Sequence, residues 1–447
     1  MRPVLSSAAV VTGLMLPSTH ARASNGEAVF LGNEAALSGG AVVAWVDDGG
    51  AAWYNPAGLA SIDRTSVDLS ASAFVLRHYV LPDAALTRLP TGPVAADASF
   101  TEMVSVPSAL TIVRRLAKGV SGALSVYVPH HESPLVKTSY QSDGSVPYQY
   151  QWSIAASRTT TRYYAGPAVG WEMAPGLSMG VSAFATYETQ ATTRNFRSNL
   201  VTATSAGPAQ AIITFDRRIQ SDLFGTAWVL GWRWDISSAW SAGMVLRGPL
   251  WHLGGEREID FGQSGTQLSP GAAPVASYDA ATESEMPDTL DQMEPARITL
   301  GISRRIASGR VALEGGWQSA AAGGGNVRVP VWNLRAGGAF AVSERFTLGG
   351  GLFTDRSPQP PPTALGVSHV DFYGGSLGLQ FRSPYEVHGD DEEPAGLIFS
   401  TTLAARYAVG LGEIGSLLFD PLQVPVDQPA DVTIHELSLH VGSALDF

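Results

Sequence analysis

Apolar and polar residues alternate along most of the chain, so that every second residue of a segment has the same character. The segment from Leu177 to Tyr187 is typical. Its odd positions are Leu177, Met179, Val181, Ala183, Ala185 and Tyr187, and its even positions are Ser178, Gly180, Ser182, Phe184 and Thr186. Successive side chains of a β-strand point to opposite faces of a sheet, so this period predicts strands with one apolar face.

About fourteen segments show this alternation, with bounds good to a few residues each. They lie near residues 65–76, 107–116, 119–128, 160–171, 177–187, 222–234, 239–249, 297–305, 309–318, 331–342, 345–354, 370–382, 396–409 and 433–447. Short connections fall at 117–118, 172–176, 235–238, 306–308 and 343–344, a somewhat longer one at 383–395, and long ones at 77–106, 129–159, 188–221, 250–296, 319–330, 355–369 and 410–432. Short turns at one end and long loops at the other, with an even strand number, are typical of transmembrane β-barrels.

The two faces of these segments differ in chemistry. The apolar face carries no Asp, Glu, Lys or Arg, and a basic side chain at a bilayer midplane costs roughly 2–4 kcal/mol, so lipid selects for this absence. The other face is small and polar with occasional charges, which are Asp68, Arg233, Arg247, Glu314 and Arg335. A soluble sandwich would carry more charge on its polar face. We therefore expect the apolar face to meet lipid and the polar face to line a lumen.

The first residues have the composition of a secretory signal peptide. Arg2 supplies a positive charge, residues 4–16 form a short apolar core, and Ala21-Arg22-Ala23 matches an A-x-A cleavage site. We expect cleavage after residue 23, so that the mature chain begins at Ser24. The absence of cysteine excludes a lipid-modified N-terminus and a disulfide framework.

Composition agrees with a barrel. Of the 447 residues, 45% are hydrophobic and 15% are charged, and an ordinary globular chain carries about 25% charged residues. Beyond the signal peptide no stretch reaches the ~18 consecutive apolar residues of a membrane-spanning helix. The predicted fold is all-β, a transmembrane antiparallel barrel of about 14 strands, whose hydrophobicity is hidden by alternation.

The last strand ends on an aromatic residue. Leu437, Leu439, Val441, Leu445 and Phe447 alternate with small and polar residues. A terminal aromatic residue such as Phe447 resembles the signal by which the barrel-assembly machinery recognises outer-membrane barrels. Export and the barrel pattern together predict a multi-pass protein of the outer membrane, in contact with the lipid bilayer and lipopolysaccharide.

Residues 24–62 precede the first strand and do not alternate. The run 29–46 is rich in small apolar residues, and a turn at 47–50 follows it. Asn55 is a good helix N-cap and Pro56 a good first helical residue, so a short helix is expected to begin there. The apolar content favours a plug inside the barrel over a tail in the periplasm. The expected organisation is a signal peptide at 1–23, a hatch at 24–62 and a barrel at 63–447.

Three motifs resemble one family. They are "VDDGGAAWYNPAGLASI" from Val46, "PARITLGISRRI" from Pro295 and "WNLRAGGAFAVSERFTLGGGLFTDRSPQP" from Trp332. They are similar to the hatch signature, a proline-led strand and an aromatic-glycine hairpin of the FadL/OMPP1/TodX family of outer-membrane transporters for long-chain fatty acids and other hydrophobic compounds.

The resemblance implies a fourteen-stranded barrel with an N-terminal hatch, in which Asn55, Pro56, Ala57 and Gly58 form the hatch motif. It also implies capture of a hydrophobic small molecule in an external groove on loops 188–221 and 250–296, transfer to a lumenal site, and lateral exit through the wall. In this chain those loops are rich in polar and acidic residues.

A lumenal cation would hold the carboxylate of an acidic cargo. The candidates by alternation are Arg233, Arg247, Arg297 and Arg335. The alternative is that each pairs with a lumenal acid, such as Glu314 or Asp68, and stiffens the barrel.

Other functions are less well supported. A net charge of −12 argues against binding of nucleic acid, which needs a basic stripe. An outer-membrane lipid hydrolase is another alternative, but the sequence contains no nucleophile elbow and no metal cluster, and no cofactor is expected. His130 and His131 are expected in an exposed external loop. A structural or secretion-accessory barrel and an open polar porin remain alternatives.

Overall fold

The computed structural model describes residues 25, 29–89, 92–133, 135–143, 148–286, 292–323, 326–362, 368–387, 395–419 and 426–447. The predicted signal peptide lies outside these residues.

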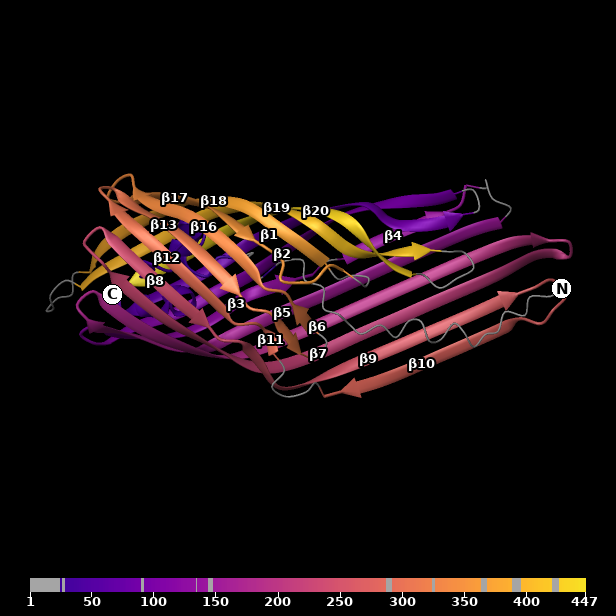
Figure 1. Cartoon of the computed structure of the whole chain (residues 1–447), viewed down its shortest axis with the longest axis horizontal. Helices are drawn as coiled ribbons and strands as arrows, with labels where there is room; N and C mark the ends of the chain where they lie inside the picture. Colours follow the sequence, from indigo (N-terminus) through magenta and orange to yellow (C-terminus); the bar gives the residue numbers. More distant parts are fainter. Residues whose placement is uncertain are drawn as a thin grey trace.

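Antiparallel strands close into a barrel (Figure 1). Around its wall lie, in order, β1 (Ser66–Leu89), β2 (Gly92–Ala117), β3 (Val120–Glu132), β5 (Tyr148–Ala174), β6 (Leu177–Thr204), β7 (Gly207–Asp235), β8 (Trp240–Arg247), β12 (Arg297–Ile306), β13 (Gly309–Gln318), β16 (Val331–Ala341), β17 (Phe346–Asp355), β18 (Ser368–Val387), β19 (Ala395–Phe419) and β20 (Val426–Asp446). β20 pairs back onto β1, from Asp446 opposite Ser66 to Thr433 opposite Val80. Closure leaves no edge within the wall, which is what a lipid environment requires.

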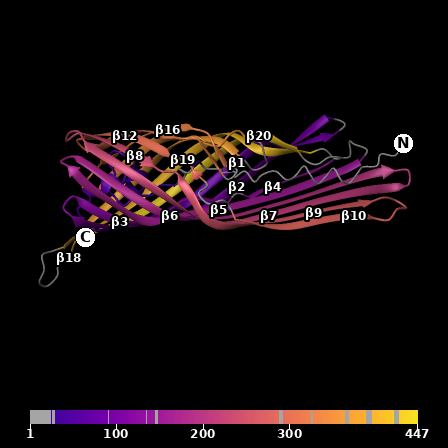
Figure 2. The same cartoon turned by 60° about the horizontal axis from the view of Figure 1, so that its bottom comes forward.

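Three of the wall strands continue far beyond the barrel. β5, β6 and β7 run to the opposite end of the molecule from the C-terminus, and Figure 2 shows them side by side there. They are joined by β4 (Leu135–Gln141), β9 (Leu250–Leu268) and β10 (Val275–Glu285). We call this part the extension. The shorter strands are β11 (Gln292–Glu294), β14 (Ala321–Gly323) and β15 (Asn326–Arg328).

The extension corrects the prediction of long loops. Much of 77–106, 129–159, 188–221 and 250–296 is strand. The alternation continues through these segments, but their apolar residues lie on the opposite face from those of the barrel. The sequence therefore lacks a continuous apolar face along the whole strand, and these strands were missed. The short turns lie where they were predicted, and Thr65 and Phe447 exchange backbone hydrogen bonds of 3.2 and 2.9 Å beside them.

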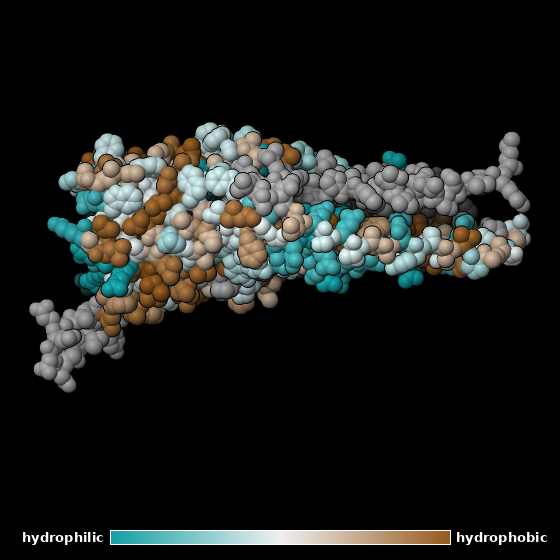
Figure 3. Space-filling view, turned by 90° about the horizontal axis from the view of Figure 1, so that it is seen from below, coloured by the Kyte–Doolittle hydropathy of each residue, from teal (hydrophilic) through white to brown (hydrophobic). Residues whose placement is uncertain are grey.

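The outer face of the barrel is apolar, as expected. Leu69, Leu352, Leu377 and Leu403 are among its exposed side chains, and Leu377 is 76% exposed. Figure 3 shows hydrophobic residues gathered over the barrel and hydrophilic residues over the extension beside it. An exposed apolar surface of this size is stable against lipid and not against water.

The N-terminal segment fills the barrel. It contains α1 (Asn33–Leu37), α2 (Ala51–Tyr54) and the 3₁₀ helix η1 (Pro56–Ser61), and every residue of 30–46 is buried. Wall glycines let it approach closely, because a Cβ at Gly231 would lie 2.0 Å from Asn55 Oδ1. The small polar face of the strands therefore leaves room for the N-terminal segment. Among the described residues, no helix is long and apolar enough to cross a membrane.

Two further layers follow along β1 beyond this segment. At Arg77, buried ion pairs join neighbouring strands: Arg77 Nε lies 2.7 Å from Glu436 Oε2, and Arg406 contacts the same carboxylate. At Ala85 an apolar cluster includes Trp152 and Phe419. From the C-terminal end outward, the interior thus passes from the N-terminal segment to a charged layer and then to an aromatic layer.

Candidate functional site

The Asn-Pro-Ala-Gly motif at residues 55–58 makes contacts within the N-terminal segment and joins this segment to the wall. Asn55 is fully buried and caps η1, accepting a bond of 3.1 Å from the amide of Ala57. Its Nδ2 donates to the carbonyls of Val43 (2.6 Å) and of Trp232 (3.0 Å) on β7. The predicted N-cap at Asn55 and first helical position at Pro56 are confirmed.

Gly58 completes the motif by allowing a close crossing of two stretches of the segment. A Cβ at this position would lie 2.1 Å from the carbonyl oxygen of Val46. Any other residue would force the two stretches apart, so glycine is required here by space and not by backbone angle.

Arg247 on β8 holds the segment most closely among the predicted arginines. Its Nη2 donates to the carbonyl of Trp53 at 2.7 Å, and its guanidinium carbon lies 4.0 Å from the centre of the Trp53 ring. One side chain thus makes a hydrogen bond and a cation–π contact to the same residue. Arg247 binds the N-terminal segment, a role that alternation alone did not predict.

Three other wall arginines repeat this contact at longer distances. Arg335 donates to the carbonyl of Gly40 and Arg310 to that of Trp45, both at 3.3 Å. Arg233 donates to the Ser61 hydroxyl at 3.2 Å and lies 3.3 Å from Asp235. Arg310 was missed from the sequence because it lies near a turn, where alternation is weakest. A row of cations on successive strands thus faces neutral acceptors of the segment.

Arg297 behaves differently. Its Nη2 donates to Gln318 Oε1 at 3.0 Å, which joins β12 to β13 within the wall. Arg297 stands directly opposite Arg247 in the pairing of β12 with β8. Two like charges at opposed positions of neighbouring strands destabilise a sheet unless an anion or a dense set of acceptors lies beside them.

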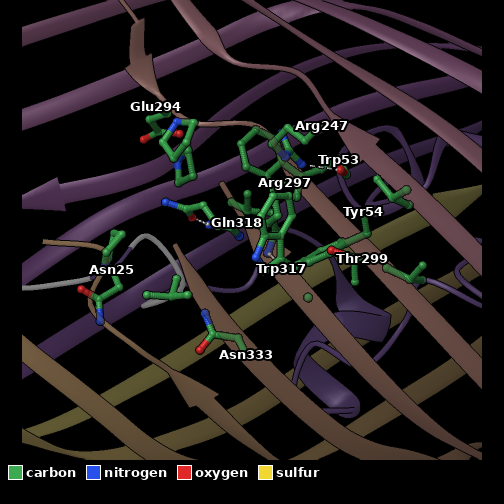
Figure 4. Close-up of a pocket in the computed structure, with 18 of the residues that line it drawn as sticks. Asn25, Trp53, Tyr54, Arg247, Glu294, Arg297, Thr299, Trp317, Gln318 and Asn333 are labelled. Carbon is green, nitrogen blue, oxygen red and sulfur yellow. Dashed lines mark hydrogen bonds between the residues drawn. The ribbon is translucent and has the colours of Figure 1, made fainter. Parts of the chain in front are cut away.

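A cavity of about 110 Å³ lies between the N-terminal segment and this part of the wall (Figure 4). Three of the four predicted arginines, Arg247, Arg297 and Arg335, line it, and Arg233 does not. Leu31, Val43, Trp53 and Val245 give it apolar surface. The cavity therefore offers both greasy walls and cationic groups.

Two acids border the same cavity. Glu294 contacts Arg162, and Glu314 is 2% exposed and accepts the amide hydrogen of Val43. Glu314 is thus a second wall residue that binds the segment. The sequence alternative, a pairing of the arginines with Glu314 or Asp68, did not anticipate bonds from the wall to the backbone of the segment.

Acidic side chains also lie within the segment itself. Asp48 accepts amide hydrogens from Glu34 and Gly50, each at 2.9 Å, and Glu34 accepts that of Asp47 at 2.8 Å. Burial raises the pKa of Asp48 to about 6 and the pKa of Glu34 well above its usual range. In the described part of the chain, no group of three or more His, Cys, Asp or Glu residues is arranged to hold a metal ion.

His130 does not lie in an exposed loop, which corrects the sequence prediction. It is 5% exposed on β3, and its Nε2 lies 2.6 Å from Glu132 Oε1. The strand runs to Glu132, whereas its predicted end was residue 128. The prediction ended too early because the inward positions here carry titratable side chains instead of small ones. The histidine belongs to the charged layer of the interior.

The extension carries an apolar inner face, which the polar composition of its segments had concealed. Phe215 on β7 meets Phe261 on β9 with ring centres 5.3 Å apart. Trp152 stacks on Phe419 at 4.1 Å and donates to the Thr87 hydroxyl at 2.9 Å. The expectation of a merely polar and acidic surface on 188–221 and 250–296 is therefore wrong for the side that faces inward.

An apolar belt, a closed ring of strands and an interior filled by the chain's own N-terminal segment define a transmembrane β-barrel. The family model for the outer membrane protein transport protein (OMPP1/FadL/TodX) matches residues 6–304. The chain belongs to this family, whose members are outer-membrane transport proteins and not enzymes. The resemblance read from the sequence motifs is thereby confirmed, and the barrel lies in the outer membrane.

Solved structures agree on the fold. A FadL homologue from Pseudomonas aeruginosa is 13% identical, with a TM-score of 0.55 over 93% of this chain and 98% of that one. A TodX monoaromatic hydrocarbon channel with the deltaS2 mutation is 12% identical, with a TM-score of 0.52 over 95% and 100%. Its deltaS2S3 mutant is 11% identical, with a TM-score of 0.51 over 93% and 99%. No curated protein matches the chain.

Proposed function

We propose that this protein carries hydrophobic small molecules, long-chain fatty acids or compounds of similar character, through the outer membrane. In this proposal residues 1–23 are a cleaved signal peptide, 24–62 a hatch that plugs the lumen, and 63–447 a barrel of fourteen wall strands. The burial of 30–46 and the ring of pairings from β1 back to β1 support this division. Phe447 serves as the terminal assembly signal.

The cargo path is inferred from where apolar surface meets the interior. The inner face of the extension, with Phe215 and Phe261, lies on the external side and can receive a greasy solute. The cavity beside Trp53 is the next apolar space toward the hatch. A hydrophobic solute that follows these surfaces avoids the polar lipopolysaccharide layer, which it crosses poorly by itself.

One observation carries the proposal: the cavity between hatch and wall combines apolar side chains with Arg247, Arg297 and Arg335. Ligand sites of this kind are mostly apolar with a few placed polar groups. The arginines favour a cargo with an anionic head, because guanidinium groups bind carboxylates through short, charge-assisted hydrogen bonds.

The test uses the purified protein in planar bilayers and in detergent. The intact protein is expected to show no steady ion conductance, because the hatch fills the lumen, and a variant lacking residues 30–62 is expected to conduct. Equilibrium dialysis with radiolabelled dodecanoate and dodecanol is expected to detect binding of both, with sucrose as the control. Steady conductance of the intact protein together with no binding of either chain would establish a polar porin instead.

A further inference from the structure

We infer that His78 and His435 form a binding site for a divalent transition-metal ion, such as Zn²⁺, on the outer face of the barrel. The two histidines lie on β1 and β20, the first and last strands of the wall, which pair with each other to close it (Figure 1). A bound ion therefore joins the two ends of the closed sheet. The inference is independent of the cargo and of the N-terminal segment.

The first step is the register of the closing strands. The pairing of β1 with β20 places His78 directly opposite His435. Directly opposite residues of an antiparallel pair point to the same face, and their Cβ atoms lie about 4.5–5.5 Å apart. Both side chains point outward, because their neighbours along the chain, Tyr79 and Glu436, are buried in the interior. The two imidazoles therefore share one small area of the outer face.

The second step is the orientation of the two rings. His435 Nδ1 lies 2.9 Å from the Tyr407 hydroxyl on β19, and His78 Nδ1 lies 3.0 Å from the Thr101 hydroxyl on β2. These two partners lie on opposite sides of the pair, since β19 is the other neighbour of β20 and β2 is the other neighbour of β1. In an imidazole the edge that contains Nε2 lies across the ring from Nδ1. Both Nδ1 atoms therefore point away from the pair, and both Nε2 edges turn toward the space between the rings.

The third step is the chemistry of the two free nitrogens. A histidine that binds a metal through one nitrogen almost always donates a hydrogen bond from the other, which fixes the tautomer and the ring. The hydroxyls of Tyr407 and Thr101 can each accept such a bond. Among the described residues, the Nε2 atoms of His78 and His435 have no hydrogen bond and no ion pair. Both lone pairs are therefore available to one ion.

The kind of ion follows from the ligands. Zn²⁺ lies about 2.0–2.1 Å from an imidazole nitrogen, so the two Nε2 atoms need to come within roughly 4 Å of each other. Rotation of the side chains covers the difference from the Cβ separation. Imidazole suits Zn²⁺, Cu²⁺ and Ni²⁺, whereas Ca²⁺ and Mg²⁺ take oxygen ligands. We therefore expect the first group of ions to bind, with water in the remaining coordination positions.

The site lies at the edge of the apolar belt, where an ion can reach it from water. On β20, His435 lies between the exposed Leu437 on one side and the exposed Asp431 on the other. The outward residues two positions away from each histidine, on both strands, are uncharged. No cationic side chain directly beside the pair therefore opposes a metal ion.

The test is a metal titration of the purified protein in detergent, without a histidine tag because a tag would itself bind the ion. Titration calorimetry with Zn²⁺ is expected to show a site that His78→Ala and His435→Ala each weaken by about tenfold or more. Ca²⁺ at the same concentration should not bind there. His131→Ala is the matched control and should bind Zn²⁺ like the parent. His131 also bonds a hydroxyl through Nδ1, 2.7 Å from Thr161 Oγ1, but no histidine stands opposite it in the pairing with β5.

Two further measurements separate coordination from a merely structural effect. Electron paramagnetic resonance of bound Cu²⁺ should show splitting from two imidazole nitrogens in the parent, and His435→Ala should lose this pattern. Tyr407→Phe keeps both ligands and removes one supporting hydroxyl, so it should weaken Zn²⁺ binding by about tenfold and retain the two-nitrogen pattern.

The bound ion should also stabilise the closed barrel. A folded barrel changes its gel mobility on heating, and Zn²⁺ should raise the temperature of this change in the parent and in His131→Ala but not in His78→Ala, because the ion binds the folded state alone. The same mobility, measured without metal, checks that each variant folds, and His78→Gln replaces His78→Ala if the latter does not. Equal Zn²⁺ affinity in the parent and the His78 variant, or a Cu²⁺ spectrum with a single nitrogen, would show that the two histidines do not form a metal site.

Discussion

The membrane belt, which is the part of the barrel whose outer face is apolar, and the extension share the same strands. The apolar side chains point outward in the belt and inward in the extension. On β7, Phe224, Leu230 and Trp234 point outward in the belt, with Phe224 and Trp234 more than half exposed. Nearer the end of the same strand that lies in the extension, Ile219 and Leu223 are buried on the inner face. The backbone geometry is continuous across the change. The surrounding medium, lipid or water, therefore decides which face of a strand is apolar.

The reversal falls at a row of stacked aromatic residues. Tyr163 on β5 lies 6.3 Å from Tyr187 on β6, which lies 5.0 Å from Phe224 on β7. From Phe224 to Trp234 there are roughly eleven residues, which span about 25 Å across a bilayer at a tilt near 45°. This length matches the apolar band of outer-membrane barrels, so the aromatic row marks the outer edge of the lipid.

The interiors of the two regions differ for a related reason. In the belt the outer face is apolar and the inner face is small, and the N-terminal segment fills the space inside. In the extension, the described strands supply their own core through Trp152 and Phe419. One region is filled by a separate segment and the other by its own side chains.

The largest expected effect tests the core of the extension. Trp152→Ala removes a fully buried ring that stacks on Phe419 and bonds to Thr87, and a change of this kind costs about 3–5 kcal/mol. Limited proteolysis should then cut within the extension while the belt keeps its heat-dependent gel mobility. The outward neighbour change Ser153→Ala should have little effect. Unfolding of the whole barrel by Trp152→Ala would show that the two regions are not separate.

A somewhat smaller effect is expected from a charge on the outer face. Leu230→Arg places a guanidinium near the bilayer midplane and should lower the free energy of unfolding by roughly 2–4 kcal/mol. Gln220→Arg, outward on the same strand but in the extension, should change it by less than about 0.5 kcal/mol. Urea unfolding from phospholipid vesicles measures both. Equal losses would place the extension in the membrane as well.

The sequence predicts the belt well because a single condition, the exclusion of charge from the face that meets lipid, determines its pattern. Lipid excludes charge from one face, and the small opposite face then follows from period two, as in 177–187. The extension obeys a rule of the same period with the opposite sign, and it is interrupted by buried ion pairs such as Arg162 with Glu188. The segments of the extension therefore have a polar average composition and no continuous apolar face. For this reason the sequence predicts loops where the structure has strands.

The site was only partly accessible from sequence for a different reason. Alternation correctly places Arg247, Arg297 and Arg335 on the inner face, and all three line one cavity. Arg247 and Arg335 donate to backbone carbonyls of the N-terminal segment, and every residue has such a carbonyl, so no side-chain pattern can mark these acceptors. The same holds for the glycines of the wall, because the close approach that requires them appears only once the N-terminal segment lies against the strands.

The smallest expected effect concerns a single hydroxyl inside the belt. Ser182 on β6 is fully buried and donates to the carbonyl of Ala52 in the N-terminal segment at 2.7 Å. Ser182→Ala leaves that carbonyl without this donor at a cost of about 1 kcal/mol. Opening can be followed through a thiol introduced at the fully buried position Ser38 by Ser38→Cys. The rate at which a water-soluble maleimide labels this thiol should rise roughly fivefold. Thr189→Ala, on the outer face of the same strand in the extension, should leave labelling unchanged. Equal labelling in the two variants would mean that the inner face of the belt is small only to leave space, and that hydrogen bonds from the wall contribute little to holding the N-terminal segment.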